Sequence, residues 1–173
     1  MRMQTLLSVV VVMMVVLTVT SASAQAPTAP AAPAAAPPPM YGAPITLEQA
    51  KKVMAGAEAE AKKNNWNMVI TILDSGGNLV MTHRMDGAQF GSIEVAREKA
   101  YSAVAFRRPT KAFEDGVAQG GANLRILRLP GASPLEGGVP IVVDGKLIGA
   151  IGVSGALSTQ DAQTARAGIE AMK

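Results

Sequence analysis

The segment Phe106–Thr110 combines residue types that bind carboxylates. Arg107 and Arg108 carry guanidinium groups, whose forked N–H donors match the geometry of a carboxylate. A helix is expected to begin at the end of this segment, and the free N–H groups and dipole of a helix N-terminus also favour an anion. The segment therefore predicts an anion-binding site. Alternatively, both arginines pair with acidic groups of the protein itself, such as Glu114, Asp115 or those of a neighbouring subunit.

Two further side chains are candidate ligands for iron. His83 is the only histidine, and on a strand it shares one face with Leu79, Met81 and Met85. Its imidazole suits iron, and the methionines are softer alternatives. Tyr101 offers a phenolate, which also binds ferric iron. The competing interpretation makes His83 a hydrogen-bonded core residue and Tyr101 a core aromatic with a satisfied hydroxyl.

Glycines recur along the run Gly137–Gly155, where side chains would normally pack. Asp144 and Gly145 supply the positive φ angles of a two-residue hairpin turn between two apolar strands. Gly149 and Gly152 fall inside the second strand, where glycine usually marks a close approach by backbone or by a ligand. The groove beside them is therefore either filled by a helix of the same domain or open to a small molecule.

The elements that must position these groups alternate along the chain. A capping box at Thr46–Gln49 predicts a helix that ends at Asn64 and buries one apolar face, made of Ala50, Val53, Met54, Ala57 and Ala61. Strands are expected at 67–73 and 78–84, and in the glycine hairpin 137–155. Further helices are expected at 92–106, from about 110 to 119, and after Ser158 as the capping residue.

This order, α-β-β-α-α-β-β-α, predicts an α+β fold with an antiparallel sheet and helices packed on it. The stretch between Gly120 and Gly138 is expected to be a loop. Asp74 and Asp86 flank the second strand; they serve turn geometry or bind a cation.

Composition excludes several functions. With no cysteine and one histidine, the sequence has no disulfide, no thiolate nucleophile and no histidine-rich metal centre. It contains no nucleophile elbow, phosphate-binding loop or dinucleotide fingerprint. The formal net charge of +3 is small and its basic residues are scattered, so nucleic acid is not expected as a partner. Any catalysis would belong to a bound cofactor.

The N-terminal region has the features of an exported protein. Residues 1–24 combine a basic start, a short apolar run and an A-x-A cleavage site, so they are interpreted as a signal peptide. The alanine- and proline-rich stretch 25–44 is expected to be a flexible linker, and 45–173 a single domain. We therefore expect a periplasmic or secreted protein that starts at Gln25 and has no stable membrane span in its mature form.

Three runs of the domain, at 74–88, 96–110 and 137–155, resemble the GlcG/HbpS family of haem-binding proteins, which includes the C-terminal domain of PduO-type proteins. The resemblance covers essentially all of 45–173. It implies a profilin-like fold, homo-oligomers that are often octamers, and, for the secreted branch, haem binding with haem degradation. It also implies a haem-coordinating role for Thr110, which matches the family's threonine after the arginine pair.

The sequence thus leads to the hypothesis of an exported haem-binding protein that assists oxidative haem degradation or senses haem or iron. The predicted haem contacts are Arg107, Arg108, Thr110, Phe106, His83, Tyr101, Gly149 and Gly152, with Thr110 or His83 as the axial ligand of the iron. Two alternatives stay open. One is a small-molecule or corrinoid-binding accessory or sensor domain without catalysis, and the other is a purely structural oligomer.

Overall fold

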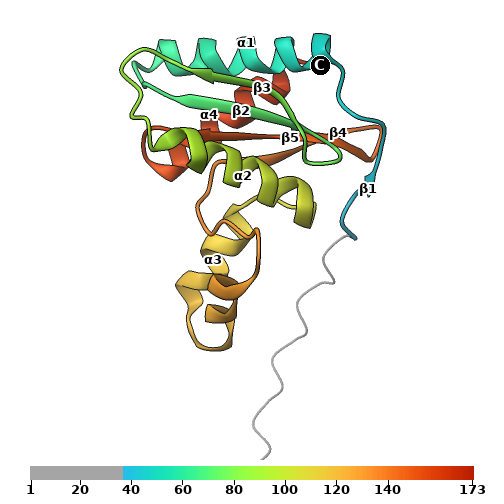
Figure 1. Ribbon diagram of the computed structural model, residues 1–173, viewed down its shortest axis with the longest axis vertical. Helices are drawn as coiled ribbons and strands as arrows, with labels where there is room; N and C mark the ends of the chain where they lie inside the picture. Colours follow the sequence, from blue (N-terminus) through green and yellow to red (C-terminus); the bar gives the residue numbers. More distant parts are fainter. Residues whose placement is uncertain (1–36) are drawn as a thin grey trace, which may run out of the picture. The chain divides into compact units, whose positions relative to one another are not determined.

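The computed structural model describes residues 37–173 as one sheet with helices on both faces (Figure 1). The strands are β1 (Met40–Tyr41), β2 (Val69–Asp74), β3 (Leu79–Arg84), β4 (Gly138–Val143) and β5 (Lys146–Ser154). The helices are α1 (Leu47–Lys63), α2 (Ser92–Phe106), α3 (Lys111–Gln119) and α4 (Ser158–Glu170), with a 3₁₀ helix, η1 (Gly121–Arg128). The predicted order of elements is confirmed, and β1 and η1 are additions to it. The predicted signal peptide and residues 25–36 of the predicted linker lie outside the described residues.

β5 is the centre of the sheet. It pairs antiparallel with β2 on one side and with β4 on the other, and β3 pairs antiparallel with β2 at the edge. The β4–β5 hairpin turns at Asp144 and Gly145, whose φ angles of 49° and 74° are both positive, as the sequence predicts. The α+β class with an antiparallel sheet is therefore confirmed, with the short β1 as its one parallel addition.

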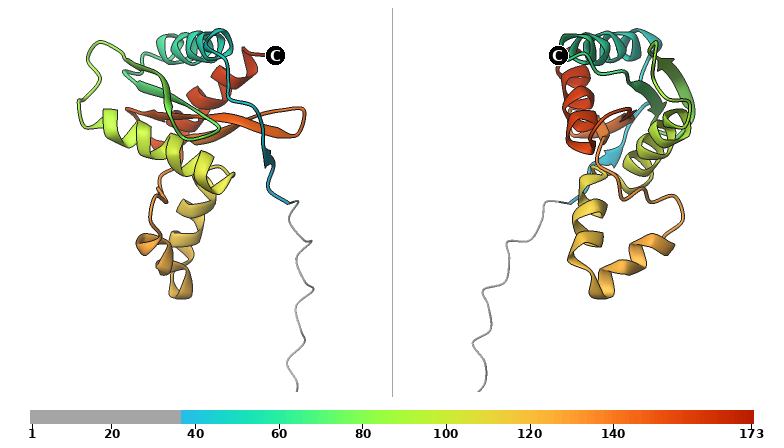
Figure 2. Two further views of the ribbon diagram at one scale, coloured as in Figure 1. Left: turned by 45° about the vertical axis from the view of Figure 1, so that its right-hand side comes forward. Right: turned by 90° about the vertical axis from the view of Figure 1, so that its left-hand side faces the viewer.

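The helices form two layers, one on each face of the sheet (Figure 2). α1 and α4 cover one face, and α2 covers the other. The apolar stripe predicted for α1 is buried at every position: Ala50, Val53, Met54, Ala57 and Ala61. Thr46 caps this helix, because its Oγ1 accepts a hydrogen bond from the Gln49 N–H (3.2 Å) and Gln49 Oε1 accepts one from the Thr46 N–H (2.9 Å).

Three local predictions need correction. Residues 40–42 of the predicted linker belong to the fold, because β1 pairs with β5 and the Gly42 N–H donates a backbone hydrogen bond of 2.8 Å to Leu147 of β5. Ser158 is the first residue of α4 rather than its cap, and Gln160 Oε1 instead accepts a hydrogen bond from the Leu157 N–H (3.1 Å). The stretch expected to be a loop after Gly120 contains η1.

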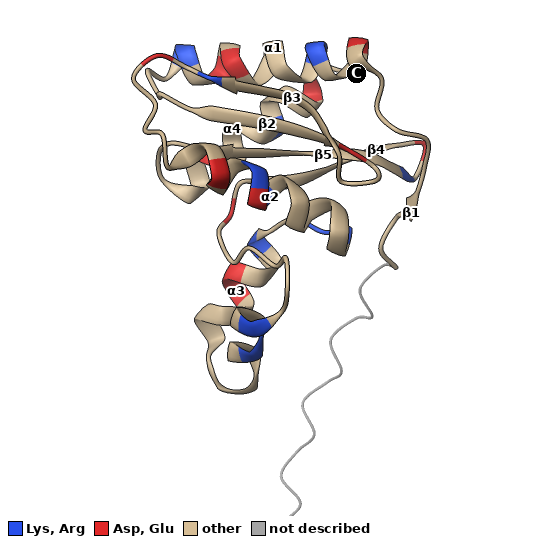
Figure 3. Ribbon diagram, in the orientation of Figure 1, with Lys and Arg blue, Asp and Glu red and all other residues tan. Residues whose placement is uncertain are grey.

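α3 and η1 stand away from the sheet as an arm of the domain (Figure 1). α3 buries one side chain, Phe113, and η1 buries none. Lys and Arg positions are interspersed with Asp and Glu positions on the helices, except in η1, where the charged residues are arginines (Figure 3). Between residues 37 and 173, no helix is both long and apolar enough to cross a bilayer.

Candidate functional site

Arg107 ends α2 in a left-handed conformation, with φ 54° and ψ 39°. This region is unusual for a residue with a side chain and directs the chain away from the helix axis. The guanidinium carbon lies 5.4 Å from the centre of the Tyr41 ring, and Nη1 donates a hydrogen bond to the carbonyl oxygen of Pro39 (3.3 Å). Arg107 is therefore held by the segment that precedes α1.

Arg108 is held in a similar way by a different aromatic ring. Its guanidinium carbon lies 5.8 Å from the centre of the Phe113 ring, and its Nε donates to the carbonyl oxygen of Phe106 (3.2 Å). Phe106 and Phe113 pack edge to face, with ring centres 5.1 Å apart. Phe106, which is half-buried, thus packs against the ring that lies under Arg108, and Arg108 is exposed.

Neither arginine forms an ion pair with a carboxylate within residues 37–173. Asp115 pairs with Lys111, and Glu114 Oε2 accepts a hydrogen bond of 2.6 Å from the Glu136 N–H. The predicted alternative, in which the arginines pair with Glu114 and Asp115, is therefore not formed. Because each guanidinium uses one of its donors on a backbone carbonyl, the other N–H groups remain for an external anion.

Thr110 lies beside the arginine pair but is completely buried. Its Oγ1 accepts a hydrogen bond from the Gly138 N–H (2.9 Å), and its own N–H donates to the Gly138 carbonyl (3.0 Å). No side-chain hydrogen bond caps the start of α3. The hydroxyl thus joins α3 to β4, and in this conformation it is not accessible to a ligand.

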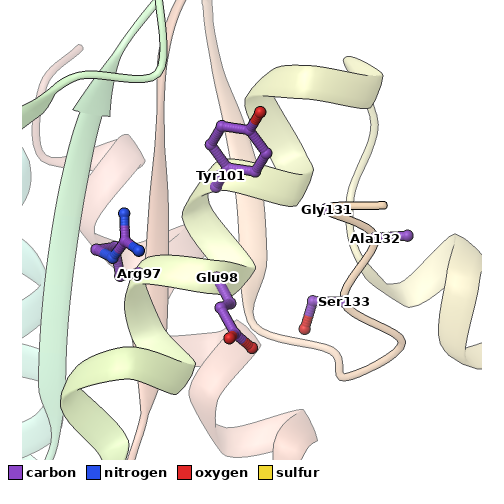
Figure 4. A pocket seen from close by; sticks show the side chains of 6 residues that line it. All are labelled: Arg97, Glu98, Tyr101, Gly131, Ala132 and Ser133. Atoms are coloured by element: carbon purple, nitrogen blue, oxygen red, sulfur yellow. The ribbon is translucent and has the colours of Figure 1, made fainter. Parts of the chain in front are cut away.

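Tyr101 lies in a pocket of about 290 Å³ between α2 and the loop after η1. Figure 4 shows Tyr101, Arg97 and Glu98 projecting from α2 on one side and residues 131–133 on the other. The ring packs closely on Gly131, where an added Cβ would come within 2.7 Å of Cε1. The side chain is 44% exposed, so Tyr101 is not the core aromatic of the competing interpretation.

His83 lies on the other side of the sheet. Its Nδ1 is 3.3 Å from Oε2 of Glu58 on α1, and 43% of its side chain is exposed. A hydrogen bond from Lys62, together with the neighbouring His83, lowers the pKa of Glu58 although burial opposes this. Because α2 covers the opposite face, His83 does not share a site with the arginine pair within one subunit. It is also not a buried core residue.

The glycines of β5 face protein rather than a groove. A Cβ at Gly152 would overlap the carbonyl oxygen of Ala96 on α2, and one at Gly149 would overlap the carbonyl oxygen of Leu73. Both glycines are buried. The packing interpretation therefore accounts for them, and the structure leaves no space beside them for a ligand.

Sequence reasoning missed the contributions of Tyr41, Arg97 and the loop 131–133. Arg97 could have been found, because it stands one helical turn before Tyr101 and therefore on the same face of α2. Tyr41 and the loop carry no local signal, since both reach α2 from distant parts of the chain. The described residues contain no group of three or more His, Asp or Glu side chains arranged for a metal ion.

The sheet between two helical layers defines a small α+β domain, and two arginines without a carboxylate partner in residues 37–173 lie at the end of α2. The family model described as "Haem degrading protein HbpS-like" matches residues 45–170. The chain belongs to this HbpS-like family.

Three similar proteins illustrate the family. Protein GlcG of Escherichia coli strain K12 is 42% identical over 110 residues, which are 64% of this chain and 81% of GlcG. The corrinoid adenosyltransferase PduO of Salmonella typhimurium strain LT2 is 34% identical over 131 residues, which are 74% of this chain and 39% of PduO. A crystal structure of a PduOC–heme complex superimposes with a TM-score of 0.68 at 30% identity, covering 74% of this chain and 94% of that chain.

Proposed function

We propose that this protein binds haem on the outer surface of α2. The observation that carries the proposal is the state of Arg107 and Arg108: each is oriented by an aromatic ring, and neither is neutralised by a carboxylate of the described chain. Guanidinium groups in this state bind carboxylates strongly, and haem carries two propionates. The family description and the heme-bound structural relative support the same ligand.

The residues along α2 fit the other requirements of haem. Tyr101 is exposed in the pocket, and a phenolate is an established protein ligand of haem iron. Arg107, the C-cap of α2, follows Tyr101 by six positions, or about 9 Å along the helix axis, and we propose that one haem spans this distance. Tyr101 therefore replaces Thr110 and His83 as the proposed iron contact, because the Thr110 hydroxyl is buried and His83 lies on the opposite face.

The pocket itself is at the small end of the range for ligand sites, about 300–1,000 Å³. One subunit would therefore cover only part of a haem macrocycle. We propose that a second copy of the chain completes the site, since η1 exposes Leu124 and Leu127, and Leu129 directly after it is also exposed. Light scattering should give several protomers per particle. A strictly monomeric mass at micromolar concentration would contradict this part of the proposal.

Export and haem degradation are further parts of the proposal. Residues 1–24 would direct the chain out of the cytoplasm, which N-terminal sequencing of the mature protein would test by finding Gln25 first. When bound, haem would supply redox-active iron for oxidative chemistry. The chain's own residues would hold the propionates at Arg107 and Arg108 and limit solvent access at Tyr101. Haem breakdown would be followed as loss of the Soret band with a reductant and oxygen.

A corrinoid ligand is the second candidate, because the chain matches part of a corrinoid adenosyltransferase. Haem is preferred, since the structural relative with a named ligand is a heme complex. The third hypothesis, a structural oligomer without a ligand, leaves the two unneutralised arginines without a role. Titration with haem and with a corrinoid separates the three, because the structural oligomer binds neither.

The decisive experiment is haem titration of a double variant, Arg107→Met/Arg108→Met, followed at the Soret band. Methionine keeps the aliphatic stem and removes the charge. Binding should weaken by about 1.5–3 kcal/mol for each lost charge-assisted contact, while circular dichroism stays unchanged. The matched control is Lys51→Met/Lys52→Met in α1, where both side chains are exposed on the opposite face of the sheet. Equal haem affinity in the two double variants would refute the proposed site.

A further inference from the structure

The segment Pro39–Ile45, which we name the N-terminal strap, is fixed to the start of β5. β1 within it pairs parallel with Lys146 and Leu147. The Gly42 N–H donates to the Leu147 carbonyl and the Ile45 N–H to the Ile148 carbonyl, each at 2.8 Å. Ile45 is 95% buried and anchors the end of the strap. The strap is thus an ordered part of the domain rather than a free tail.

Tyr41 connects the strap to the last turn of α2. Its hydroxyl donates to the carbonyl oxygens of Val104 (3.0 Å) and Ala105 (3.1 Å). The last carbonyls of a helix lack the usual donor from the next turn. The Val104 carbonyl also accepts from the Arg107 N–H (3.2 Å), so the Tyr41 hydroxyl is a second donor to Val104 and a side-chain donor to Ala105. The same tyrosine ring lies under the guanidinium of Arg107, whose Nη1 donates to Pro39 of the strap. The strap therefore contacts both the end of α2 and the Arg107 side chain that follows it.

We infer that Tyr41 is a positioning residue for anion binding by Arg107. This inference rests on the proposed haem site and adds to it a role for a residue outside the pocket. An aromatic ring covers the flat face of the guanidinium and leaves the in-plane N–H donors directed outward. Holding the long arginine side chain before the ligand arrives lowers the entropy that binding must lose. Tyr41 itself does not contact the ligand.

Three single variants separate positioning from folding. Tyr41→Leu removes the ring and the hydroxyl, Tyr41→Phe removes only the hydroxyl, and Met40→Ala changes the exposed neighbour on the same strand. Haem affinity should fall about fivefold in Tyr41→Leu, as expected for a lost cation–π contact. Tyr41→Phe should bind haem within about twofold of the wild type even though its hydrogen bonds to α2 are lost. Met40→Ala should behave as the wild type.

The chemistry of the ligand gives a readout that a merely structural role would not change. Haem dimethyl ester has neutral groups in place of the propionates, so its affinity should be the same for Tyr41→Leu and the wild type. In an Arg107→Met background, the Tyr41→Leu substitution should no longer weaken haem binding, because the group that it positions is gone.

Each result decides the inference. A fivefold loss that is specific for the free propionates and absent in the Arg107→Met background supports it. Wild-type haem binding with equal affinity in Tyr41→Leu overturns the positioning role and leaves the haem site standing. A loss of affinity that persists with haem dimethyl ester, or in the Arg107→Met background, also overturns the positioning role and leaves the haem site standing. No haem binding by the wild type overturns the proposed function, and the positioning role with it.

Discussion

Lys99 on α2 and Asp161 on α4 form an ion pair of 2.7 Å in which 3% of each side chain is exposed. Lys99 Nζ also donates to the carbonyl oxygen of Val153 (3.0 Å), and Asp161 Oδ1 accepts from the Ala156 N–H (3.2 Å). Burial raises the pKa of Asp161, although the hydrogen bond and charge of Lys99 oppose this. The pair joins the two helical layers at the C-terminal end of β5, where Val153 lies.

Breaking this pair should be costly, because one charge would remain buried without a partner. Lys99→Met is expected to lower the free energy of unfolding by about 3–5 kcal/mol, measured by urea denaturation. The control, Lys51→Met, breaks an exposed pair with Glu48 and should cost less than about 1 kcal/mol. Adding Asp161→Leu to Lys99→Met should restore part of the stability. Equal losses of unfolding free energy in Lys99→Met and Lys51→Met would show that the buried pair contributes no more to stability than the exposed pair.

Periodicity predicted most of the fold, because each helix has to bury one face. The stripe of α1 and the hairpin turn at Asp144 were both readable from short windows of sequence. Lys99 stands within the small-residue stripe of α2, between Ala96 and Ala103, which indicates that it points inward. Its partner Asp161 is 62 residues away, and no local pattern identifies it.

The candidate site was only partly predictable for the same reason. The pair Arg107–Arg108 was identified from residue chemistry alone. The aromatic rings that hold these guanidinium groups were not identified, because Tyr41, for example, reaches the end of α2 across 63 residues of sequence. The strand period correctly placed His83 on one face of its strand. The sequence could not show that α1 covers this face of the sheet, whereas the arginines lie on the face that α2 covers.

Gly152 should not tolerate any side chain, because the backbone of α2 occupies the place of its Cβ. Gly152→Ala is expected to lower the free energy of unfolding by about 2–3 kcal/mol, measured by thermal or urea denaturation. Gly91→Ala is the control, since an added Cβ there meets nothing within 4 Å. If Gly152→Ala kept wild-type stability and lost only haem binding, a ligand groove would exist beside β5 after all.

His83 should be dispensable for the haem spectrum. It lies on the α1 face with a half-exposed side chain, so His83→Ala is expected to leave the Soret maximum and spin state unchanged. Stability should fall by less than about 1 kcal/mol, because a half-exposed side-chain contact with Glu58 contributes little. Glu58→Gln removes the charge beside His83 together with the ion pair to Lys62, and it should also leave the Soret maximum unchanged. A shifted Soret band in His83→Ala alone would make the histidine an iron ligand.

Asp74 should make stability depend on acid pH. Although partial burial raises the pKa of Asp74, hydrogen bonds from Asn78, Gly76 and Gly77 outweigh it and hold the pKa below its usual value. A depressed pKa in the folded state gives stability that is present above the unfolded pKa of about 3.9 and lost as the pH falls through the folded pKa. Asp74→Asn should therefore be about 1 kcal/mol less stable than the wild type at pH 7, and this difference should shrink as the pH falls below about 3.9. A constant difference across this range would exclude the charge as its cause.

Substitutions of Thr110 should affect the stability of the fold, whereas substitutions of Tyr101 should affect the haem spectrum. Thr110→Val removes the buried hydroxyl and leaves the Gly138 N–H without its acceptor, so stability should fall by about 1–3 kcal/mol while the haem spectrum is unchanged. Tyr101→Phe keeps the exposed ring and should change stability by less than about 0.5 kcal/mol, but it should shift the Soret band because the phenolate is lost. Tyr41→Phe is the matched control, since it also removes one phenol hydroxyl and should leave the Soret position unchanged. The reverse pattern, with a spectral shift in Thr110→Val and none in Tyr101→Phe, would require Thr110 to leave its contact with Gly138 when haem binds.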